Sequence, residues 1–550
     1  MKKIFSSENF SYAKLKDALR NVKSGDEIFL SAGEYHIYEK ETEQVFYYQS
    51  NCDAGVKNIA FYLKNKKNVK ITGDNAHLVF HGRVSPFIFD GCKNITLSGF
   101  TLDYAKAFYM QGEVVVSTEE YVELKVKEGT SLAMQNGFLT QKVEEITQTY
   151  HDFPSMWQAF DKELKRVLLG SQCRIVRFTD GEETTRDLFR AEMLENGNVR
   201  FYGKEMAEFA VGCIVVLNGE SRQANTLFAF NCKNLTVQDV TAYYTPSMGV
   251  NCQTCHNVTL RRFHILLGEE RHGIVTAGAD ATHFINCTGK VRLKECIFEN
   301  MLDDGANIHG IFTKVTSVEK NKVKVILSHH QQYGANVYFK GDTLSVYQGG
   351  GLVPRGKAKV LSSELTKENE ITLTLKGTLP KEGDLIENFT RQAKFTFDDC
   401  SVTNNRPRGV LVATRKKAVV KNSWFSNSSS CIEVSAESKY WYESGGVKNL
   451  LIKNNVFNDF CHQYGGAAVG IVPIYDFNEK QPEYYCQNIR IKNNVIITDS
   501  KWIVYALRSK NITVKNNAYI HKETGKSLYG AGVCFYEENC KDMKVTIPVE

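Results

Sequence analysis

Short runs of alternating hydrophobic and polar residues recur along most of the chain, and Asn, Asp or Gly ends most runs. This alternation, rich in β-branched residues, is typical of strands separated by turns. Many runs contain one phrase: a polar residue, Asn, an aliphatic residue, any residue and a second aliphatic residue. It occurs at residues 66–71, 92–97, 232–237, 255–260, 447–452, 486–491 and 509–514. Where no extra loop intervenes, the phrase returns after 23 residues, as from Cys232 to Cys255.

A fixed period of this length predicts a solenoid in which each repeat forms one coil and successive coils stack as parallel strands. Helical repeats are excluded because the units lack a hydrophobic period of 3.6 residues, and leucine-rich repeats are excluded because their leucine framework is missing. We therefore predict an all-β fold, a right-handed parallel β-helix. Its repeated asparagines would occupy tight bends, since Asn tolerates left-handed backbone geometry.

The cysteines fit the same prediction. Cys232 and Cys255 occupy equivalent positions in the repeat, and a buried Cys behaves as a small hydrophobic residue. Cys252 and Cys255 also form a C-x-x-C motif, which is found in redox and metal sites. No second pair stands at the spacing of a zinc site, so we favour a structural role in the core.

Two regions lack the repeat and instead alternate in the manner of antiparallel strands, as at residues 112–126 and 321–328. We interpret them as inserted small β-barrels, the first with a short helix at residues 156–168. At the N-terminus, residues 11–30 predict an amphipathic helix, a turn and a strand that cover the open end of the solenoid. The expected organisation is an N-terminal cap with the first coils (1–105), a first barrel (106–225), central coils (226–310), a second barrel (311–392) and C-terminal coils (393–550).

Composition and charge narrow the class of protein. Hydrophobic residues make up 42% of the 550 residues and prolines number only 9, which argues against extensive disorder. The net charge of +6 comes without a basic run, so we expect no nucleic-acid partner. No stretch approaches the roughly 20 apolar residues of a membrane helix, and the N-terminus lacks the apolar segment of a signal peptide. We expect a cytoplasmic protein, or a periplasmic or secreted bacterial protein if a leader was removed.

The chemistry-bearing candidate is the adjacent pair Asp303 and Asp304. Asp280 precedes Asp303 by 23 residues, which is one coil, so we expect it to lie about 4.8 Å away on the neighbouring strand. Crowded carboxylates cannot all ionise freely, so at least one pKa should rise. Glycosidic cleavage requires such a protonated acid beside an ionised base. In isolation the Asp303–Asp304 pair favours a solvated acidic turn, and only Asp280 in register with it favours a catalytic site.

Adjacent strand residues point to opposite faces, so Asp303 and Asp304 can share one site only at a bend or bulge. We expect that bend at Gly305. Gly278 and Gly305 also lack a Cβ atom and therefore permit close approach of backbone or ligand.

The segment L-D-D-G-A-N-I-H-G at residues 302–310, together with Asp280, resembles the three-aspartate site of β-helical glycosidases, including the polygalacturonases. In detail the chain is more similar to glycoside hydrolase family 110, the inverting α-1,3-galactosidases of blood-group-B type. Residues 79–87, 404–414 and 441–445 add to this resemblance, which extends through most of the chain.

The resemblance implies an exo-acting inverting hydrolase that removes terminal α-1,3-linked galactose from oligosaccharides or glycans, without metal or cofactor. It implies Asp303 as the general acid, with Asp280 and Asp304 holding the water as base. The residues expected to line the sugar pocket are Asn307, His309, Arg408, Glu433, Trp441 and Glu443. Preference for linear or fucosylated substrates stays open, as does the oligomeric state, for which a homodimer is one possibility.

Three alternatives stay open at this stage. A polygalacturonase-like endo-hydrolase of acidic polysaccharide would need several basic residues beside the aspartates, where the sequence near them offers Arg271 and Arg408. A polysaccharide lyase would need an Arg or Lys base, often with Ca²⁺ on clustered acids. A non-catalytic carbohydrate-binding β-helix would bind sugar without turnover.

Overall fold

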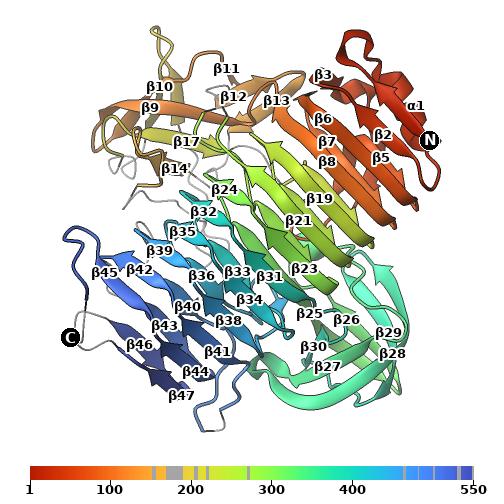
Figure 1. Ribbon diagram of the computed structural model, residues 1–550, viewed down its shortest axis with the longest axis vertical. Coiled ribbons are helices and arrows are strands. Elements are labelled where there is room, and N and C mark those ends of the chain that lie inside the picture. The colour runs from red at the N-terminus through yellow and green to blue at the C-terminus, as the bar shows by residue number, and fades with distance from the viewer. Residues whose placement is uncertain are drawn as a thin grey trace.

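The computed structural model describes residues 1–150, 157–168, 190–202, 209–218, 222–268, 273–461, 466–480, 482–499, 502–528 and 534–547. Most of its strands run parallel and stack coil upon coil, from the N-terminal coils at the upper right of Figure 1 to the C-terminal coils at the lower left. The parallel β-helix predicted from the repeat is confirmed. No helix among the described residues is long and apolar enough to cross a membrane.

Three parallel stacks of strands form the walls of the solenoid. The longest stack includes β6 (Lys67–His81), β8 (Lys93–Tyr104), β19 (Lys233–Ala242), β21 (His256–Ile265), β23 (Thr288–Lys294), β31 (Lys394–Asp398), β34 (Ala418–Lys421), β38 (Leu450–Lys453), β41 (Cys486–Lys492), β44 (Ser509–Lys515) and β47 (Lys541–Val545). A second, shorter stack contains β24 (Ile297–Glu299), β32 (Ser401–Thr403), β35 (Trp424–Ser426), β39 (Val456–Asn458), β42 (Val495–Thr498) and β45 (Ala518–His521).

The third stack carries the site described below. It contains β5 (Gly55–Lys64), β7 (Val84–Asp90), β18 (Leu227–Phe230), β20 (Val250–Gln253), β22 (Thr282–Ile285), the first residues of β25 (Ala306–Glu319), β33 (Val410–Val412), β36 (Ile432–Val434), β40 (Val469–Ile471), β43 (Val504–Leu507) and β46 (Phe535–Glu538). Apart from β5, β7 and β25, its strands are three or four residues long. The aspartates described below lie just before two strands of this stack, at its edge.

The repeated asparagines occupy the bends. Asn94, Asn234 and Asn257 have φ of 54°, 57° and 58°, in the left-handed region that Asn tolerates. Their side chains form a ladder across coils, in which Asn257 Nδ2 donates to Asn234 Oδ1 at 3.0 Å and Asn234 Nδ2 donates to Asn94 Oδ1 at 2.8 Å. Lys233 pairs with His256, which matches the 23-residue period.

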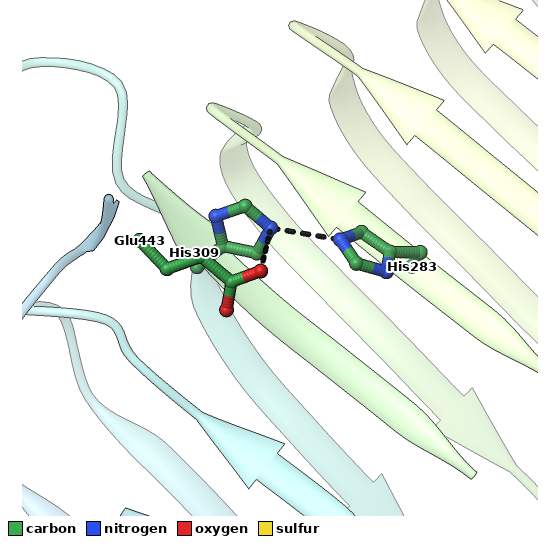
Figure 2. Close-up of side chains that lie close together, drawn as sticks. All are labelled: His283, His309 and Glu443. Carbon is green, nitrogen blue, oxygen red and sulfur yellow. Dashed lines mark hydrogen bonds and ion pairs between the residues drawn. The ribbon is translucent and has the colours of Figure 1, made fainter. Parts of the chain in front are cut away.

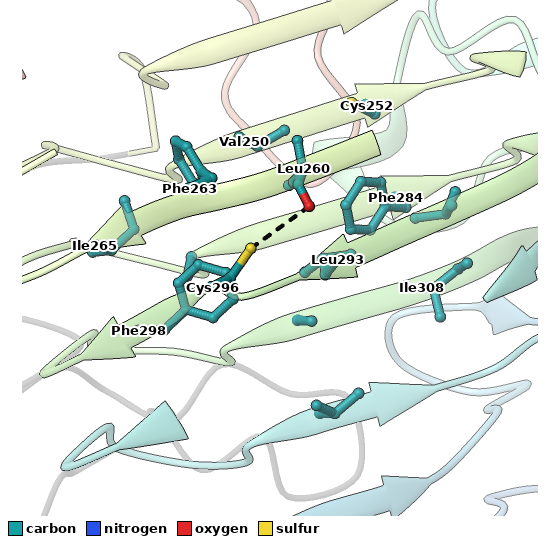
Figure 3. Packing of buried hydrophobic residues seen from close by; sticks show 14 of the residues in the cluster. Val250, Cys252, Leu260, Phe263, Ile265, Phe284, Leu293, Cys296, Phe298 and Ile308 are labelled. Atoms are coloured by element: carbon teal, nitrogen blue, oxygen red, sulfur yellow. Dashed lines mark hydrogen bonds between the residues drawn. The ribbon is translucent and has the colours of Figure 1, made fainter. Parts of the chain in front are cut away.

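The interior of the solenoid is apolar. Val250, Phe263, Leu293 and Phe298 from successive coils pack with Cys296, whose thiol donates to Leu260 O at 3.7 Å (Figure 3). The cysteines of the C-x-x-C motif, Cys252 and Cys255, are fully buried in the same core and form no disulfide. They fill space between coils, as expected for buried thiols.

The N-terminal cap has the predicted helix and strand. The helix α1 (Tyr12–Arg20) buries Leu15 and Leu19, and the hydroxyl of Tyr12 donates to Ala60 O in β5 at 2.8 Å. The strand β2 (Glu27–Leu30) follows it and pairs with β1 (Lys2–Phe5) and β6. Together these elements occupy the N-terminal end of the solenoid (Figure 1).

In the first region without the repeat, six antiparallel strands form a sheet in the order β14-β17-β9-β10-β16-β15, beside a three-stranded sheet β11-β12-β13. The bounds are β9 (Tyr109–Ser117), β10 (Tyr121–Val126), β11 (Ser131–Gln135), β12 (Phe138–Val143), β13 (Ile146–Tyr150), β14 (Trp157–Phe160), β15 (Arg190–Met193), β16 (Val199–Tyr202) and β17 (Ile214–Asn218). Leu139 and Tyr150 from the smaller sheet share one apolar core with Trp157 and Phe201 from the larger one.

The helix predicted at residues 156–168 is wrong. Residues 157–160 form β14, and a turn follows at residues 162–164. The burial pattern explains the error: Trp157 and Ala159 face the core of the insertion, whereas Phe160 belongs to the core of the solenoid. This segment is therefore apolar on both faces of a strand, and a short run of that kind resembles a helical pattern.

In the second region without the repeat, six strands close a barrel in the order β25-β26-β29-β28-β27-β30, with β30 pairing back to β25. The bounds are β26 (Lys322–Ile326), β27 (Thr343–Gln348), β28 (Val353–Lys367), β29 (Glu370–Gly377) and β30 (Leu385–Asn388). The strand β25 belongs to both parts, because its first residues pair with β22 and β33 in the solenoid wall. The exact domain boundaries stay a prediction.

Candidate active site

The three predicted aspartates lie at one edge of the third stack. Asp280 precedes β22, and Asp303 and Asp304 precede β25. Ala281 N donates to Asp304 O at 2.8 Å, and Ala277 pairs with Met301, which is 24 residues later. Asp280 therefore stacks on Asp304, and the expected 23-residue register with Asp303 is wrong by one residue. One oxygen of each carboxylate lies within 4.8 Å of one oxygen of the others.

A bend in the backbone allows the neighbours Asp303 and Asp304 to share this site. The chain bends at Leu302, Asp303 and Gly305 before β25 begins. Asn405 Nδ2 donates to Asp303 O at 3.0 Å and holds the bend from the next coil. A Cβ atom on Gly305 would lie 2.6 Å from Gly409 O, so this position must be glycine for the coils to pack.

Three arginines surround the aspartates. Arg408 forms a two-pronged ion pair with Asp304, with both N–O distances at 2.9 Å, and its third nitrogen lies 3.3 Å from Glu433 Oε1. Arg222 pairs with Asp303 at 2.5 Å, and Arg406 lies 3.9 Å from the other oxygen of Asp303. Sequence reasoning named Arg408 but missed Arg222 and the role of Arg406. Arg271 lies outside the described residues.

Burial and these charges give the three carboxyl groups different pKa values. Burial raises the pKa of Asp304 to about 7, against the opposing effect of Arg408. Burial and the charge of Asp303 raise the pKa of Asp280 well above its ordinary value. Burial also opposes ionisation of Asp303, but Arg222 and the two other arginines outweigh it and hold its pKa below the ordinary value. The site thus combines carboxyl groups that retain a proton near neutral pH with one that readily loses it.

A chain of buried imidazoles leads away from the aspartates. His283 Nδ1 lies 2.5 Å from Asp280 Oδ2, and His283 Nε2 lies 2.7 Å from His309 Nε2. Figure 2 shows that the same nitrogen of His309 also faces Glu443, at 3.4 Å from Oε1. Burial lowers the pKa of each imidazole to about 4. Sequence reasoning missed His283, although its spacing of three residues from Asp280 was visible.

Glu443 is held by two side-chain amides. It lies in β37 (Glu443–Ser444), which pairs with β25. Its Oε1 accepts from Asn51 Nδ2 at 3.1 Å and its Oε2 from Asn307 Nδ2 at 3.4 Å. Burial opposes its ionisation, but the imidazoles of His309 and His283 outweigh burial and hold its pKa below the ordinary value. Glu443 is therefore the ionised end of the imidazole chain.

Trp441 lies at the outer side of the cluster. Its ring stacks obliquely on His329 at 4.2 Å between centroids, and the guanidinium carbon of Arg222 lies 5.8 Å from it. Trp441, Arg408 and Glu433 are partly exposed, whereas Asn307, His309 and Glu443 are buried. The structure thus brings all nine predicted residues into one connected cluster, with three able to face solvent. That they bind substrate stays a prediction.

Two sets of donors could in principle hold a cation: the three aspartates, and His283 with His309 and Glu443. Arginines already neutralise Asp303 and Asp304. Two imidazoles bound to tetrahedral zinc at about 2.0–2.1 Å would hold their nitrogens about 3.3 Å apart. The 2.7 Å between His283 Nε2 and His309 Nε2 instead fits a hydrogen bond. The arrangement therefore fits proton chemistry better than metal binding.

Comparison with known proteins identifies a matching domain family and three curated relatives. Residues 322–386 match the model of the GLAA-B beta-barrel domain II. The chain is 28% identical over 515 residues to alpha-1,3-galactosidase A of Shewanella woodyi, covering 90% of this chain and 80% of the relative. It is 26% identical over 532 residues to alpha-1,3-galactosidase A of Bacteroides fragilis (93% and 84%) and 25% identical over 535 residues to alpha-1,3-galactosidase B of Bacteroides thetaiotaomicron (95% and 85%).

Among solved structures, the chain is similar to the Agl-KA catalytic domain, with a TM-score of 0.48 and 9% identity over 99% of this chain and 68% of that one. It is also similar to an endo-xylogalacturonan hydrolase from Aspergillus tubingensis, with a TM-score of 0.41 and 10% identity over 98% and 95%.

Proposed function

We propose that this chain, a member of glycoside hydrolase family 110, is an exo-acting inverting hydrolase that removes terminal α-1,3-linked galactose from oligosaccharides or glycans. The observation that carries the proposal is the cluster of Asp280, Asp303 and Asp304, with two pKa values raised and one lowered. Glycosidic cleavage needs carboxyl groups with different pKa values, so that one can give a proton and another can take one. The choice of galactose and of the α-1,3 linkage rests on the names of the curated relatives given above.

The register suggests how the roles divide. Asp280 and Asp304 occupy equivalent positions on neighbouring coils, where both can reach one water molecule. Asp303 stands one residue earlier and is the most exposed of the three, at 8% against 2% and 1%. In the proposed reaction Asp303 gives its proton to the glycosidic oxygen, while the attacking water gives a proton to Asp280 or Asp304. The cluster ends with as many protons as it began with.

Asp303 must hold a proton to act as the acid, and its pairing with Arg222 opposes this. We propose that a bound galactoside moves Arg222 off Asp303, so that burial raises the pKa of Asp303 and its carboxyl group takes up a proton. At 8% exposure Asp303 is the most exposed of the three, so solvent can supply that proton.

Sugar binding would fall to the partly exposed side chains. The indole face of Trp441 suits the apolar side of a galactose ring, and the carboxylate of Glu433 can accept from its hydroxyl groups. Arg408 bridges Glu433 to Asp304 and thus links binding to chemistry. The buried residues Asn307, His309 and Glu443 would support the aspartates from behind.

The polygalacturonase-like alternative requires basic residues available to an acidic substrate. The structure does place Arg222, Arg406 and Arg408 beside the aspartates, more than the sequence had suggested. Each of the three, however, faces an aspartate of the cluster. This pairing favours a neutral sugar over a uronate.

The decisive experiment is incubation with a Galα1-3Gal oligosaccharide, in linear and fucosylated forms, with released galactose followed by NMR. We expect free galactose, first as the β-anomer because the mechanism inverts. The nearest oxygens of the cluster lie within 4.8 Å, closer than the roughly 6.5–9.5 Å usual between the carboxyl groups of inverting enzymes, so the anomer must be read directly. No galactose from either form would refute the function, and initial α-galactose would refute inversion.

The pH dependence follows from Asp304. As part of the base it must be ionised, and burial raises its pKa to about 7. The ionised fraction grows as pH rises, so kcat/KM should fall about tenfold for each pH unit below about 7. Initial rates at constant ionic strength from about pH 5 to about pH 9 test this. A profile that stays flat down to the ordinary carboxyl range would contradict it.

A further inference from the structure

The carbonyl oxygen of Gly310 determines how protons are arranged along the imidazole chain. It lies 2.6 Å from His309 Nδ1 and can only accept, so His309 Nδ1 carries a proton. The other nitrogen of His309 meets His283 Nε2 at 2.7 Å, and one proton must lie between them. The last link, between His283 Nδ1 and Asp280 Oδ2 at 2.5 Å, also needs one proton.

Three arrangements satisfy all these links with the same number of protons. One of them, with Asp280 ionised and His283 doubly protonated, is disfavoured because burial and Arg222 oppose a positive charge on His283, whereas His309 lies beside Glu443. Two arrangements remain. In the first, Asp280 is protonated and donates to His283 Nδ1, while His283 Nε2 donates to His309 Nε2. In the second, Asp280 is ionised and accepts from His283 Nδ1, while His309 Nε2 donates to His283 Nε2 as part of an imidazolium. The second state places that imidazolium 3.4 Å from Glu443.

We propose that His283 and His309 form a proton relay that discharges Asp280 and places its proton on His309 beside Glu443. The Asp280 Oδ2–H bond breaks as His283 Nδ1–H forms, and His283 Nε2–H breaks as His309 Nε2–H forms. One proton thus leaves Asp280 and one arrives on His309, with no exchange with solvent. The role of Asp280 as a base rests on the proposed hydrolase function.

The surroundings make such a relay useful. Asp280, His283 and His309 are at most 3% exposed, so direct exchange of the Asp280 proton with water is hindered. The charged or titratable groups that face the chain are Asp303, Asp304, Arg222, Arg408 and Glu443. Burial keeps the imidazoles neutral at rest, so the first arrangement is the resting state. Glu443, held by amides of Asn51 and Asn307, stabilises the second.

His309→Gln tests the relay because glutamine can bond to His283 but cannot carry a positive charge. Asp280 could then ionise only by losing its proton to solvent, at its raised pKa. We expect the acidic limb of kcat/KM to move at least about one unit to higher pH, with activity recovering in alkaline buffer. His283→Asn, which keeps a polar group beside Asp280 but cannot reach His309, should shift the limb in the same direction. His521→Gln, on a C-terminal coil, should leave it in place.

A lowered kcat in both relay variants with an unmoved acidic limb would overturn the relay and leave a merely structural role. A second readout does not depend on hydrolysis: ¹⁵N-histidine NMR of the wild-type chain, with the two rings assigned from the variants. We expect His283 protonated at Nε2 and His309 at Nδ1, or the relayed pair of states in exchange. Two rings that both lack a proton at Nε2, or a doubly protonated His283, would overturn the proposal. These spectra test the relay even if no galactose is released.

Discussion

Asp303→Asn is expected to lower kcat for an α-1,3-galactoside by about 10²- to 10⁴-fold, the usual contribution of a general acid. The amide keeps the size of the carboxyl group and can still accept from Arg222, but it has no acidic proton to give. KM should change little because the substrate is still bound. Steady-state kinetics and calorimetric titration of the substrate, carried out in parallel, separate the two effects.

The leaving group shows whether Asp303 is the acid. An aryl α-galactoside with an acidic phenol needs little protonation, so Asp303→Asn should retain a much larger share of activity on it than on the disaccharide. Asp280→Asn and Asp304→Asn should lose both activities alike, since they act on the water. The exposed Asp74→Asn serves as the control. Unchanged turnover by Asp303→Asn would exclude it as the acid, and binding without turnover by the wild type would favour a carbohydrate-binding solenoid.

Glu387→Ala is expected to lower the free energy of unfolding by about 3–5 kcal/mol, the usual cost of leaving a buried charge without its partner. Glu387, in β30, is fully buried and forms an ion pair with Arg415. It also accepts from Tyr347 at 2.8 Å and from Tyr485 at 2.5 Å. These groups join the inserted barrel to the solenoid coils, so their loss should weaken that junction.

Urea unfolding followed by tryptophan fluorescence measures the effect of Glu387→Ala. The matched control is Glu364→Ala on the exposed side of β28, which should change stability by less than about 0.5 kcal/mol. Equal destabilisation by both variants would show that the buried ion pair contributes no more to stability than an exposed carboxylate does. Glu387→Gln should fall between them, because it still accepts from the tyrosines but leaves Arg415 without a counter-charge.

Much of the fold was predictable because its signals are local. Six of the seven asparagines of the repeat, all but Asn449, mark a left-handed bend at their own position, and the flanking residues alternate as strands do. The strands of the closed barrel, such as β26 and β29, were predictable for the same reason, because their residues alternate locally. The helix expected at residues 156–168 failed because two separate cores bury the two faces of β14, which removes the period of two from the sequence.

For the site, the sequence alone determined that Asp280, Asp303 and Asp304 meet, since the coil length brings one repeat onto the next. Only the tertiary structure decided their register and charges. Arg222 reaches Asp303 across 81 residues and Asn307 reaches Glu443 across 136, and no repeat relates them. Burial, which raises the pKa of Asp304 and lowers that of His283, exists only once the coils have stacked. A period along the chain specifies which residues become neighbours, but protonation depends on the surroundings that folding assembles.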